Sequence, residues 1–450
     1  MFKKYLYHNY RVFSGTKFWL SRRFGKTSWL IFGALFVAAA LGADTTLSVA
    51  YQVFSFLVCL ILAAALSVRF GRIKVAAERI LPRFGSAGEP ISYRMILRNP
   101  RSRAVSGLEL TDELADPRPS FEEFISTPEP GEEKRNWYDR TYGYYRWRWL
   151  VDQNQQAFPE SSRLPALPPR GHREIKLELT PRRRGVLRFA GVTVASPDAF
   201  GIFRRFKKIS LPQSVLILPK RYSLPPVDLP GLMKYEPGGV ALASAVGESQ
   251  EFVALRDYRP GDPLRHIHWK SWARTGKPIV KEFQDEFFVR HALVLDTFTP
   301  LARSDVFEEA VSVAASFACT IRTQDSLLDL MFVGPQAYCF TAGRGVGHTD
   351  QMLEILASVK TCRHQPFASL QQLVLDHLET VSGCICIFLA WDEDRQDLVA
   401  HLRALGVPLL VCVIVEAGKP TELDPGPLRH EPHTFHVLEA GRIEEGLAQL

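Results

Sequence analysis

Residues 28–68 read SWLIFGALFVAAALGADTTLSVAYQVFSFLVCLILAAALSV, and this apolar stretch sets how the chain is organised. Its only charged residue, Asp44, lies in a short polar turn between two apolar segments. A helix needs about 20 apolar residues to cross the hydrocarbon core of a bilayer, so the stretch has room for two crossings. We therefore expect a transmembrane helical hairpin at 27–68, with helices over 28–43 and 47–68.

The positive charge of the chain is concentrated next to this hairpin. The formal net charge is +7, and residues 1–26 contain seven Lys and Arg and no acidic residue. Basic residues also follow the second apolar segment, whereas the turn has none. Because Lys and Arg are enriched on the cytoplasmic side of membrane helices, we expect 1–26 to be a cytoplasmic arm and both termini to be cytoplasmic. The rest of the chain is formally neutral, so we expect no nucleic-acid partner.

Two other interpretations compete with the hairpin. A secretory signal peptide also has a basic lead, an apolar core and small residues before the cleavage site, such as those at 38–43. Cleavage there would leave a mature chain that begins with a second apolar segment of membrane-spanning length. A buried helical pair in a soluble protein fits less well, because both segments are apolar on every face. We favour the hairpin.

Residues 71–222 have the pattern of a β-rich domain. Short alternating runs at 91–97 and 174–179 are separated by Pro, Gly and Asn, which predicts strands joined by turns. Strands of this length and spacing are typical of a sandwich. Between 113 and 170 the alternation gives way to Pro, Glu, Arg and aromatic residues, which we interpret as a long insertion, ordered at least around 142–151.

The insertion contains an aromatic and arginine-rich run, YYRWRW, at 144–149. Strict alternation favours a half-buried strand, with Tyr145, Trp147 and Trp149 packed inward and the two arginines solvated. Arginines interleaved with aromatic residues could instead stack on bases or lie at a lipid headgroup layer.

From 287 to 450 the pattern changes to alternating strands and helices. The expected strands are continuous apolar runs, as parallel strands buried on both faces require. This order predicts a doubly wound α/β domain with a mostly parallel sheet. Expected strands cover 291–296, 327–333, 385–390 and 408–415, and expected helices cover 305–321, 351–359, 369–378, 396–404 and 441–450.

Cysteines and catalytic motifs give no sign of an enzyme. The seven cysteines are scattered and mostly lie in apolar runs, which is typical of reduced thiols in the cytosol. The sequence has no Gly-x-Ser-x-Gly, no His-Glu-x-x-His and no phosphate-binding glycine loop of the nucleotide-binding type. We therefore expect a non-enzymatic protein without a resident cofactor.

The linker at 223–286 contains the densest cluster of charged and aromatic residues. Pro260 and Gly261 predict a type II turn, across which Asp262 and Arg265 are close enough to pair. The arginines and aspartates predict an ion-pair network that docks this segment onto the α/β domain or onto a partner. The residues of this signature are Arg256, Asp257, Tyr258, Pro260, Gly261, Asp262, Arg265, His266, His268, Trp269, Trp272 and Arg274.

The two histidines of the signature suggest an alternative. In an extended segment His266 and His268 share one face, and with Asp262 they could supply ligands to a metal. Such a site would make the protein a metal-dependent hydrolase. Metal sites need three or four converging ligands, and no further His or Cys lies nearby in the sequence, so we favour the structural role.

The signature resembles the family of membrane-anchored bacterial proteins known as domain of unknown function fifty-eight. The resemblance implies an N-terminal membrane hairpin in the bacterial plasma membrane, cytoplasmic soluble domains and a C-terminal domain similar to the von Willebrand factor A fold. It also implies a MoxR-type AAA+ ATPase as partner, and hence a role as an interaction or adaptor protein. The matching residues are Arg256-Asp257-Tyr258, Pro260-Gly261-Asp262, Arg265, Ile267, Trp269, Trp272-Ala273-Arg274, and upstream 181–185 and 197–201.

This resemblance also raises the question of a divalent cation such as Mg²⁺. Von Willebrand A domains often hold one at strand ends, with an Asp-x-Ser-x-Ser run, a Thr at a helix start and a later Asp. Here Asp296 and Thr297 begin the first loop, but Phe298 and Pro300 replace both serines. Thr349 and Asp392 stand at the other two positions, so we expect a degenerate site at most.

Overall fold

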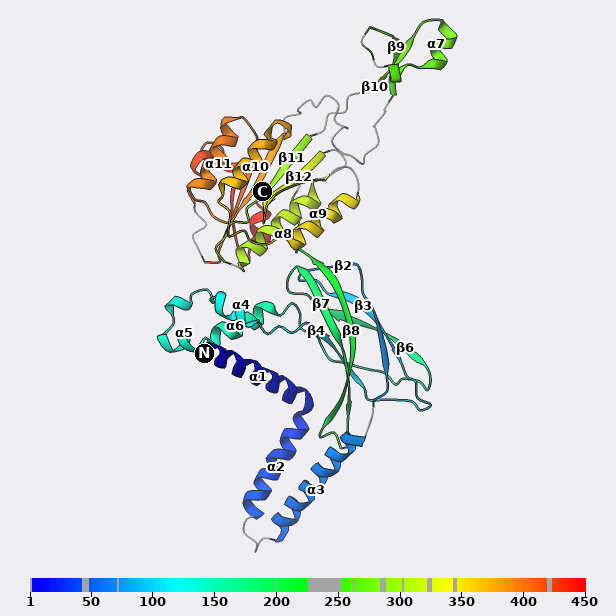
Figure 1. Ribbon diagram of the computed structural model, residues 1–450, viewed down its shortest axis with the longest axis vertical. Helices are drawn as coiled ribbons and strands as arrows, with labels where there is room; N and C mark the ends of the chain where they lie inside the picture. The colour runs from blue at the N-terminus through cyan, green and yellow to red at the C-terminus, as the bar shows by residue number, and fades with distance from the viewer. Residues whose placement is uncertain are drawn as a thin grey trace. The chain divides into compact units, whose positions relative to one another are not determined.

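The chain forms two compact units, Met1–Lys220 and Arg221–Leu450, each described by itself below. The predicted turn around Asp44, most of the linker, the turn residue Gly261 and the loop at 343–345 lie outside the described residues. The computed structural model (Figure 1) describes residues 2–42, 48–70, 73–198, 200–225, 252–260, 262, 264–283, 289–301, 303–321, 326–342, 346–418 and 423–450.

Three helices open the first unit: α1 (Phe2–Arg23), α2 (Lys26–Gly42) and α3 (Ser48–Phe70). Helices α2 and α3 lie side by side (Figure 1), and their outward side chains are mostly apolar. Val49–Val68 is long and apolar enough to cross a membrane, whereas the apolar part of α2, Thr27–Leu41, is shorter. The described chain thus has one helix of membrane-spanning length, and a second crossing by α2 stays a prediction.

The β-rich part of the first unit contains two sheets. Side chains from both sheets, among them Met95, Leu110, Leu187 and Ile217, form one core. Burial alternates along β3, which confirms the strand predicted at 91–97. One sheet has the order β1-β3-β6 and the other the order β2-β8-β7-β4-β5. Their strands are β1 (Ala76–Ile80), β2 (Phe84–Ser86), β3 (Ile91–Arg98), β4 (Glu109–Leu114), β5 (Ser162–Arg163), β6 (His172–Leu179), β7 (Gly185–Pro197) and β8 (Arg204–Leu218).

The insertion between β4 and β5 is helical, and the strand predicted at 144–149 is wrong. Those residues begin α6, which follows Gly143 in a left-handed conformation (φ 65°). Trp147 and Leu150 are buried, and residues three apart share a face of a helix, not of a strand. Arg146 is not solvated, because it pairs with Glu132. The elements of the insertion are α4 (Phe121–Ser126), η1 (Glu132–Lys134), α5 (Trp137–Tyr142) and α6 (Tyr144–Asn154).

Helix α1 packs on this insertion. The hydroxyl of Tyr7 donates to the carbonyl of Pro119 at 3.1 Å, and that of Tyr10 donates to the carbonyl of Tyr142 at 3.2 Å. The rings of both tyrosines also contact Trp147, with centroids 5.5 and 6.0 Å apart. The basic arm is therefore a helix docked on the insertion, whereas only a cytoplasmic arm was predicted.

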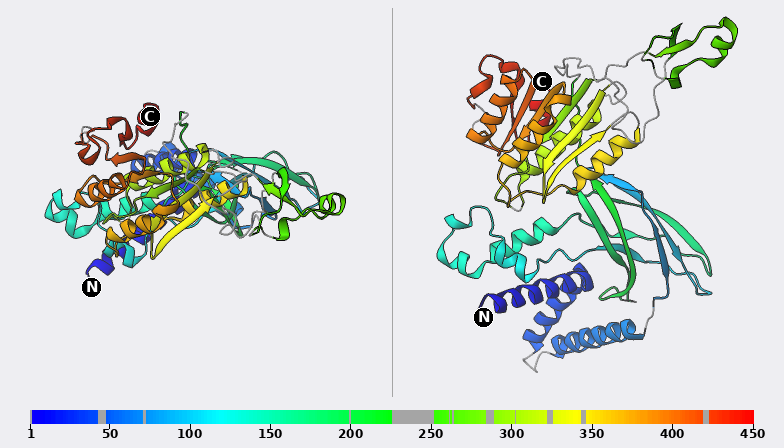
Figure 2. Two further views of the ribbon diagram at one scale, coloured as in Figure 1. Left: turned by 90° about the horizontal axis from the view of Figure 1, so that it is seen from above. Right: turned by 45° about the horizontal axis from the view of Figure 1, so that its top comes forward.

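The second unit contains a doubly wound α/β sheet of order β13-β12-β11-β14-β15-β16, in which only the β12–β13 pairing is antiparallel. The crossover after β11 leads to β12, toward one edge of the sheet, whereas the crossover after β14 leads to β15, toward the opposite edge. Because such crossovers are right-handed, α8 and α11 cover opposite faces (Figure 2). The strands are β11 (Val289–Leu295), β12 (Ser326–Val333), β13 (Ala337–Ala342), β14 (Gly383–Phe388), β15 (Leu409–Val415) and β16 (Phe435–Glu439), and the helices are α8 (Asp305–Thr320), α9 (Val346–Ser358), α10 (Ala368–His377), α11 (Glu393–Ala404) and α12 (Ile443–Leu447).

The predicted strands of this domain are confirmed by β11, β12, β14 and β15. The edge strands β13 and β16 were not predicted, and the expected closing helix at 441–450 is shortened to α12. Helices α10 and α11 share a core with one face of the sheet, which includes Leu370, Leu398 and Val411.

Candidate functional site

The signature residues form a small substructure, the signature hairpin (252–283). Strands β9 (Phe252–Asp257) and β10 (Ile279–Phe283) pair antiparallel, and η2 (Leu264–His266) and α7 (Trp269–Thr275) lie between them in sequence. Ile267 is buried and bridges to Val280, and the amide of His268 donates to the carbonyl of Ile279 at 2.8 Å. These contacts pack η2 and α7 against the strand β10.

An arginine–carboxylate pair closes the turn of the signature hairpin. The two Nη atoms of Arg256 donate to both carboxylate oxygens of Asp262 at 2.7 and 2.8 Å, and the amide of Arg259 donates to Oδ2 at 2.8 Å. These hydrogen bonds lower the pKa of Asp262 to about 2. The predicted partner of Asp262 was Arg265, whose backbone lies in η2 and whose side chain lies outside the described part. Bidentate geometry makes the observed pair a rigid brace.

The two histidines do not follow the extended geometry predicted for them. His266 ends η2 and His268 precedes α7, because Ile267 pairs with β10 while its neighbours coil. Nδ1 of His268 lies 2.6 Å from the hydroxyl of Ser271, and the carboxylate of Asp262 is held by Arg256. Across the described ranges, no three His, Cys, Asp or Glu side chains come close enough to hold a metal ion. The geometry therefore gives no support to a metal-dependent hydrolase at this segment.

The signature hairpin presents large apolar side chains to solvent. Trp269 stacks on Trp272 with ring centroids 5.2 Å apart and 20° between the planes. Trp269 is 64% exposed, and Leu264 is 68% exposed. Arg274 is exposed in the last turn of α7, Asp257 is the last residue of β9, and Tyr258 and Pro260 follow it. Exposed aromatic clusters on a braced frame are typical of protein interaction surfaces.

A second charged site lies at the carboxyl end of β11. Asp296 is fully buried and accepts hydrogen bonds from the amides of Phe298 at 2.9 Å and Leu389 at 3.1 Å. Arg395 of α11 donates to Asp296 from Nε at 3.0 Å and to Asp392 from Nη1 at 2.6 Å. Burial raises the pKa of Asp296, while the guanidinium and the two amides oppose this shift.

The guanidinium of Arg395 thus lies between two of the four residues proposed to hold a cation. The hydroxyl of Thr297 donates to the carbonyl of Val333, and Thr349 lies inside the first turn of α9 instead of at its start. Asp392 also accepts from the amide of Arg395, so it caps α11. Arg395 was not among the predicted site residues, although its i, i+3 spacing from Asp392 indicates a possible ion pair.

A third site is a cleft of about 1160 Å³ in the first unit, between α1, the end of β4 and the faces of β7 and β8. Its wall includes Glu113, which accepts from Arg22 at 2.9 Å, Lys208 at 2.8 Å and Thr193 at 2.5 Å. Burial raises the pKa of Glu113, but these hydrogen bonds outweigh it and lower the pKa overall. The Arg22–Glu113 pair ties the end of α1 to the sheet.

Comparisons with known proteins identify the family of the signature. Residues 254–385 match the family described as protein of unknown function DUF58, which confirms the predicted resemblance. The match runs from the signature hairpin into β14. The uncharacterized protein YeaD of Bacillus subtilis (strain 168) is 28% identical over 184 residues, covering 40% of this chain and 44% of that protein. The chain therefore matches less than half the length of that relative.

Similarity to solved structures is weak. The CARDB domain of a protein from Pyrococcus furiosus is 9% identical, with 32% of this chain and 93% of that chain covered and a TM-score of 0.16. Red sea bream transglutaminase is 15% identical, with 33% of this chain and 15% of that chain covered and a TM-score of 0.17. Scores this low support no conclusion about fold or function.

Proposed function

Because residues 254–385 belong to the family of proteins of unknown function DUF58, we propose that the chain is a membrane-anchored, non-enzymatic adaptor for a cytoplasmic MoxR-type AAA+ ATPase. Its role would be envelope maintenance or the maturation of protein complexes. The C-terminal domain is then von Willebrand factor A-like, and the doubly wound sheet with one antiparallel edge strand is compatible with that fold.

The anchor is a transmembrane hairpin made of α2 and α3 in the bacterial plasma membrane. Both termini and the soluble domains then lie in the cytoplasm. The side-by-side arrangement of the two helices and their exposed apolar side chains support the hairpin. The basic residues at its outer ends support the orientation.

One observation carries the adaptor function: the signature hairpin exposes Trp269 on a frame braced by Arg256 and Asp262. Tryptophan is among the residues that dominate binding energy at protein interfaces, and a rigid frame reduces the entropy lost on binding. The acidic side chains Asp262, Asp296 and Asp392 are each paired with arginine, which favours a structural role for them over a catalytic one.

The test is binding of the full-length protein, held in lipid nanodiscs, to the MoxR-type ATPase of its own organism. We expect binding in at least one of the ATP, ADP and nucleotide-free states. The variant carrying Trp269→Ala and Trp272→Ala should bind at least tenfold more weakly, because truncation of a central aromatic residue typically costs 2 kcal/mol or more.

Lys270→Ala provides a matched control, since Lys270 is exposed on the same helix. It should bind like the unmodified protein, and circular dichroism should show that all variants are folded. Failure to bind in every nucleotide state would contradict the proposed partner. Equal binding by the tryptophan variant would instead place the docking surface elsewhere.

A further inference from the structure

Helix α1 has two faces with different surroundings. Tyr7 and Tyr10 hold one face against the insertion. The opposite face, here called the outer face, carries Tyr5, Val12, Phe13 and Trp19, whose exposed fractions lie between 51% and 72%. Positions 5, 12 and 19 are separated by seven residues, about two helical turns, which places them in one stripe along the helix. An apolar stripe of this length is unusual on a water-exposed surface.

The charge of α1 indicates what covers this stripe. The helix has six basic residues, Lys3, Lys4, Arg11, Lys17, Arg22 and Arg23, and no acidic residue. An apolar face combined with a basic remainder is typical of helices that lie in the surface of a membrane with anionic lipids. A protein groove that accepts an amphipathic helix does not require such a one-sided charge.

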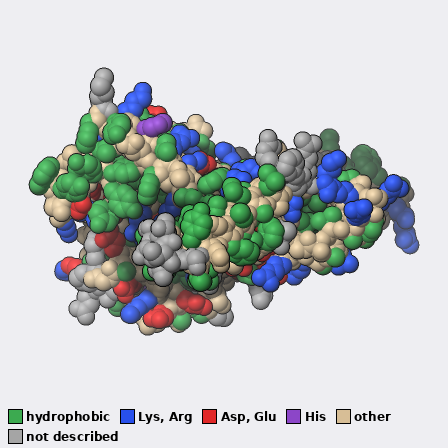
Figure 3. Space-filling model, turned by 90° about the horizontal axis from the view of Figure 1, so that it is seen from below, with side chains coloured by type: hydrophobic (Ala, Val, Ile, Leu, Met, Phe, Trp, Pro, Cys, Tyr) green, Lys and Arg blue, Asp and Glu red, His purple; other side chains and the backbone are tan. Residues whose placement is uncertain are grey.

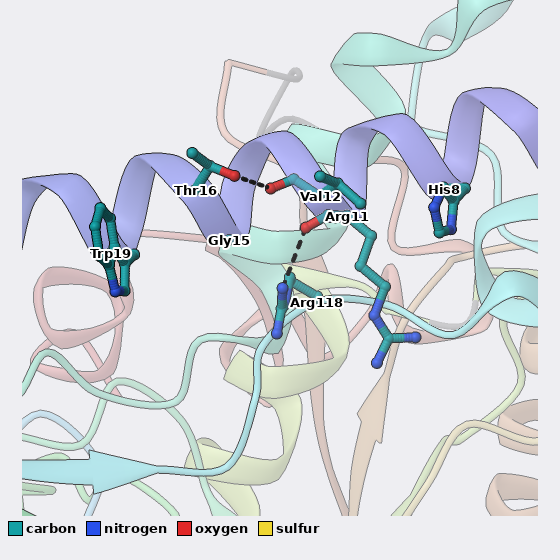
Figure 4. A pocket seen from close by; sticks show the side chains of 7 residues that line it. All are labelled: His8, Arg11, Val12, Gly15, Thr16, Trp19 and Arg118. Atoms are coloured by element: carbon teal, nitrogen blue, oxygen red, sulfur yellow. Dashed lines mark hydrogen bonds between the residues drawn. The ribbon is translucent and has the colours of Figure 1, made fainter.

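A shallow groove along α1 has the same chemistry (Figure 4). It has a volume of about 540 Å³ and is lined by His8, Arg11, Val12, Gly15, Thr16, Trp19 and Arg118. The guanidinium of Arg118 pairs with Asp116 and donates to the main-chain carbonyl of Arg11 at 3.2 Å, while the guanidinium of Arg11 donates to the hydroxyl of Tyr7 at 3.2 Å. Arginines beside a tryptophan suit the boundary between lipid phosphates and acyl chains.

The outer face is continuous with the apolar surface of α2. Helix α1 ends at Arg23 and α2 begins at Lys26. Phe24, between them, contacts the rings of Trp19, Trp29 and Phe32, with centroids 5.5 to 6.4 Å apart. Figure 3 shows hydrophobic side chains gathered on the face seen from below, over α2 and α3. A bilayer that surrounds α2 would therefore also contact the outer face of α1.

We propose that α1 lies in the headgroup layer of the membrane, with its outer face inserted among lipids and its exposed lysines, Lys3, Lys4 and Lys17, on anionic lipid phosphates. This inference rests on the proposed anchor by α2 and α3. The buried face of α1 then holds the insertion, and Arg22 with Glu113 holds the β-sheet, close to the membrane surface. The helix joins the bilayer to the first soluble unit along its length.

The test uses the full-length protein in nanodiscs of phosphatidylethanolamine and phosphatidylglycerol. A photoreactive p-benzoylphenylalanine replaces Phe13 on the outer face, Leu62 on α3 or Leu405 in the second unit, one at a time. All three residues are well exposed, so the substitutions should not disturb folding. After illumination, mass spectrometry detects lipid adducts at each position. We expect adducts at positions 13 and 62 and none at position 405.

The labelling pattern distinguishes a failure of the proposed α1 contact from a failure of the proposed anchor. Adducts at position 62 but not at position 13, and none from the same probe at Val12, overturn the inference and leave the anchor intact. Absence of adducts at position 62 contradicts the anchor, whatever the result at position 13. Replacing phosphatidylglycerol with phosphatidylcholine should reduce labelling at position 13 several-fold and leave position 62 unchanged. Equal labelling at position 13 in both lipids would contradict the role of the basic residues.

Discussion

The guanidinium of Arg395 connects two carboxylates at the carboxyl edge of the α/β sheet. Removing it by Arg395→Ala leaves the charge of Asp296 buried without its partner. We expect the free energy of unfolding to fall by about 3–5 kcal/mol, the usual cost of breaking a buried ion pair. Urea titration of the purified full-length protein, followed by circular dichroism, measures this loss.

Two further variants separate charge from packing in this prediction. Adding Asp296→Asn to Arg395→Ala should restore part of the stability, because it removes the unpaired buried charge. Arg429→Ala is the control, since the pair of Arg429 with Asp424 is exposed and should contribute little. Equal effects of Arg395→Ala and Arg429→Ala would show that the buried pair does not stabilise the domain.

His291 gives the second unit a pH dependence. It lies on β11 with 6% of its surface exposed, and burial lowers its pKa below the ordinary value of about 6.5. The unfolded chain then binds a proton that the folded chain does not, so stability falls as the pH drops below about 6.5. Urea midpoints between pH 7.5 and 5 should fall less for His291→Gln than for the unmodified protein. A slope unchanged by the substitution would assign the pH dependence to other groups.

Among single elements, α6 shows what the sequence pattern could not resolve. The run YYRWRW alternates like a strand, but Leu150 and Val151 follow without alternation, and Leu150 is buried beside Trp147. Short apolar runs are ambiguous between strand and helix, and here packing against α1 and α4 favours the helix. The contact with α1 joins residues more than a hundred positions apart, which local periodicity does not report.

Trp147 joins α1, α4 and α6 into one cluster. Replacing it by Ala should loosen all three helices, because it removes a large buried side chain and leaves a cavity, at a cost of about 3–5 kcal/mol. Relative to the unmodified protein, hydrogen exchange measured by mass spectrometry should become faster in α1 and the insertion and change less in β7 and β8. Trp137→Ala is the matched control, since Trp137 is 74% exposed. Unchanged exchange in α1 after Trp147→Ala would mean that its other contacts suffice to hold it.

Over the chain as a whole, periodicity predicted the elements that bury whole faces. The central strands β11, β14 and β15 are continuous apolar runs and were found. The edge strand β13 is mostly exposed and β16 is half-buried, so neither has that signal. Ion pairs across the fold were also beyond reach, as Arg395 and Asp296 lie 99 positions apart. The signature was recognised, but its coiled geometry depends on pairing with β10.

The proposed orientation of the chain predicts where its C-terminus lies. Green fluorescent protein fused after Leu450 should fluoresce in cells, whereas alkaline phosphatase at the same place should be inactive, because it needs disulfides that form outside the cytoplasm. High phosphatase activity together with a fluorescent-protein fusion that does not fluoresce would contradict the proposed orientation.

The position of Arg395 between Asp296 and Asp392 also has a physiological consequence. Its positive charge is covalently part of the chain and, unlike a bound metal ion, does not exchange with the solvent. A divalent cation at this edge of the sheet would therefore have to compete with a fixed positive charge for both carboxylates.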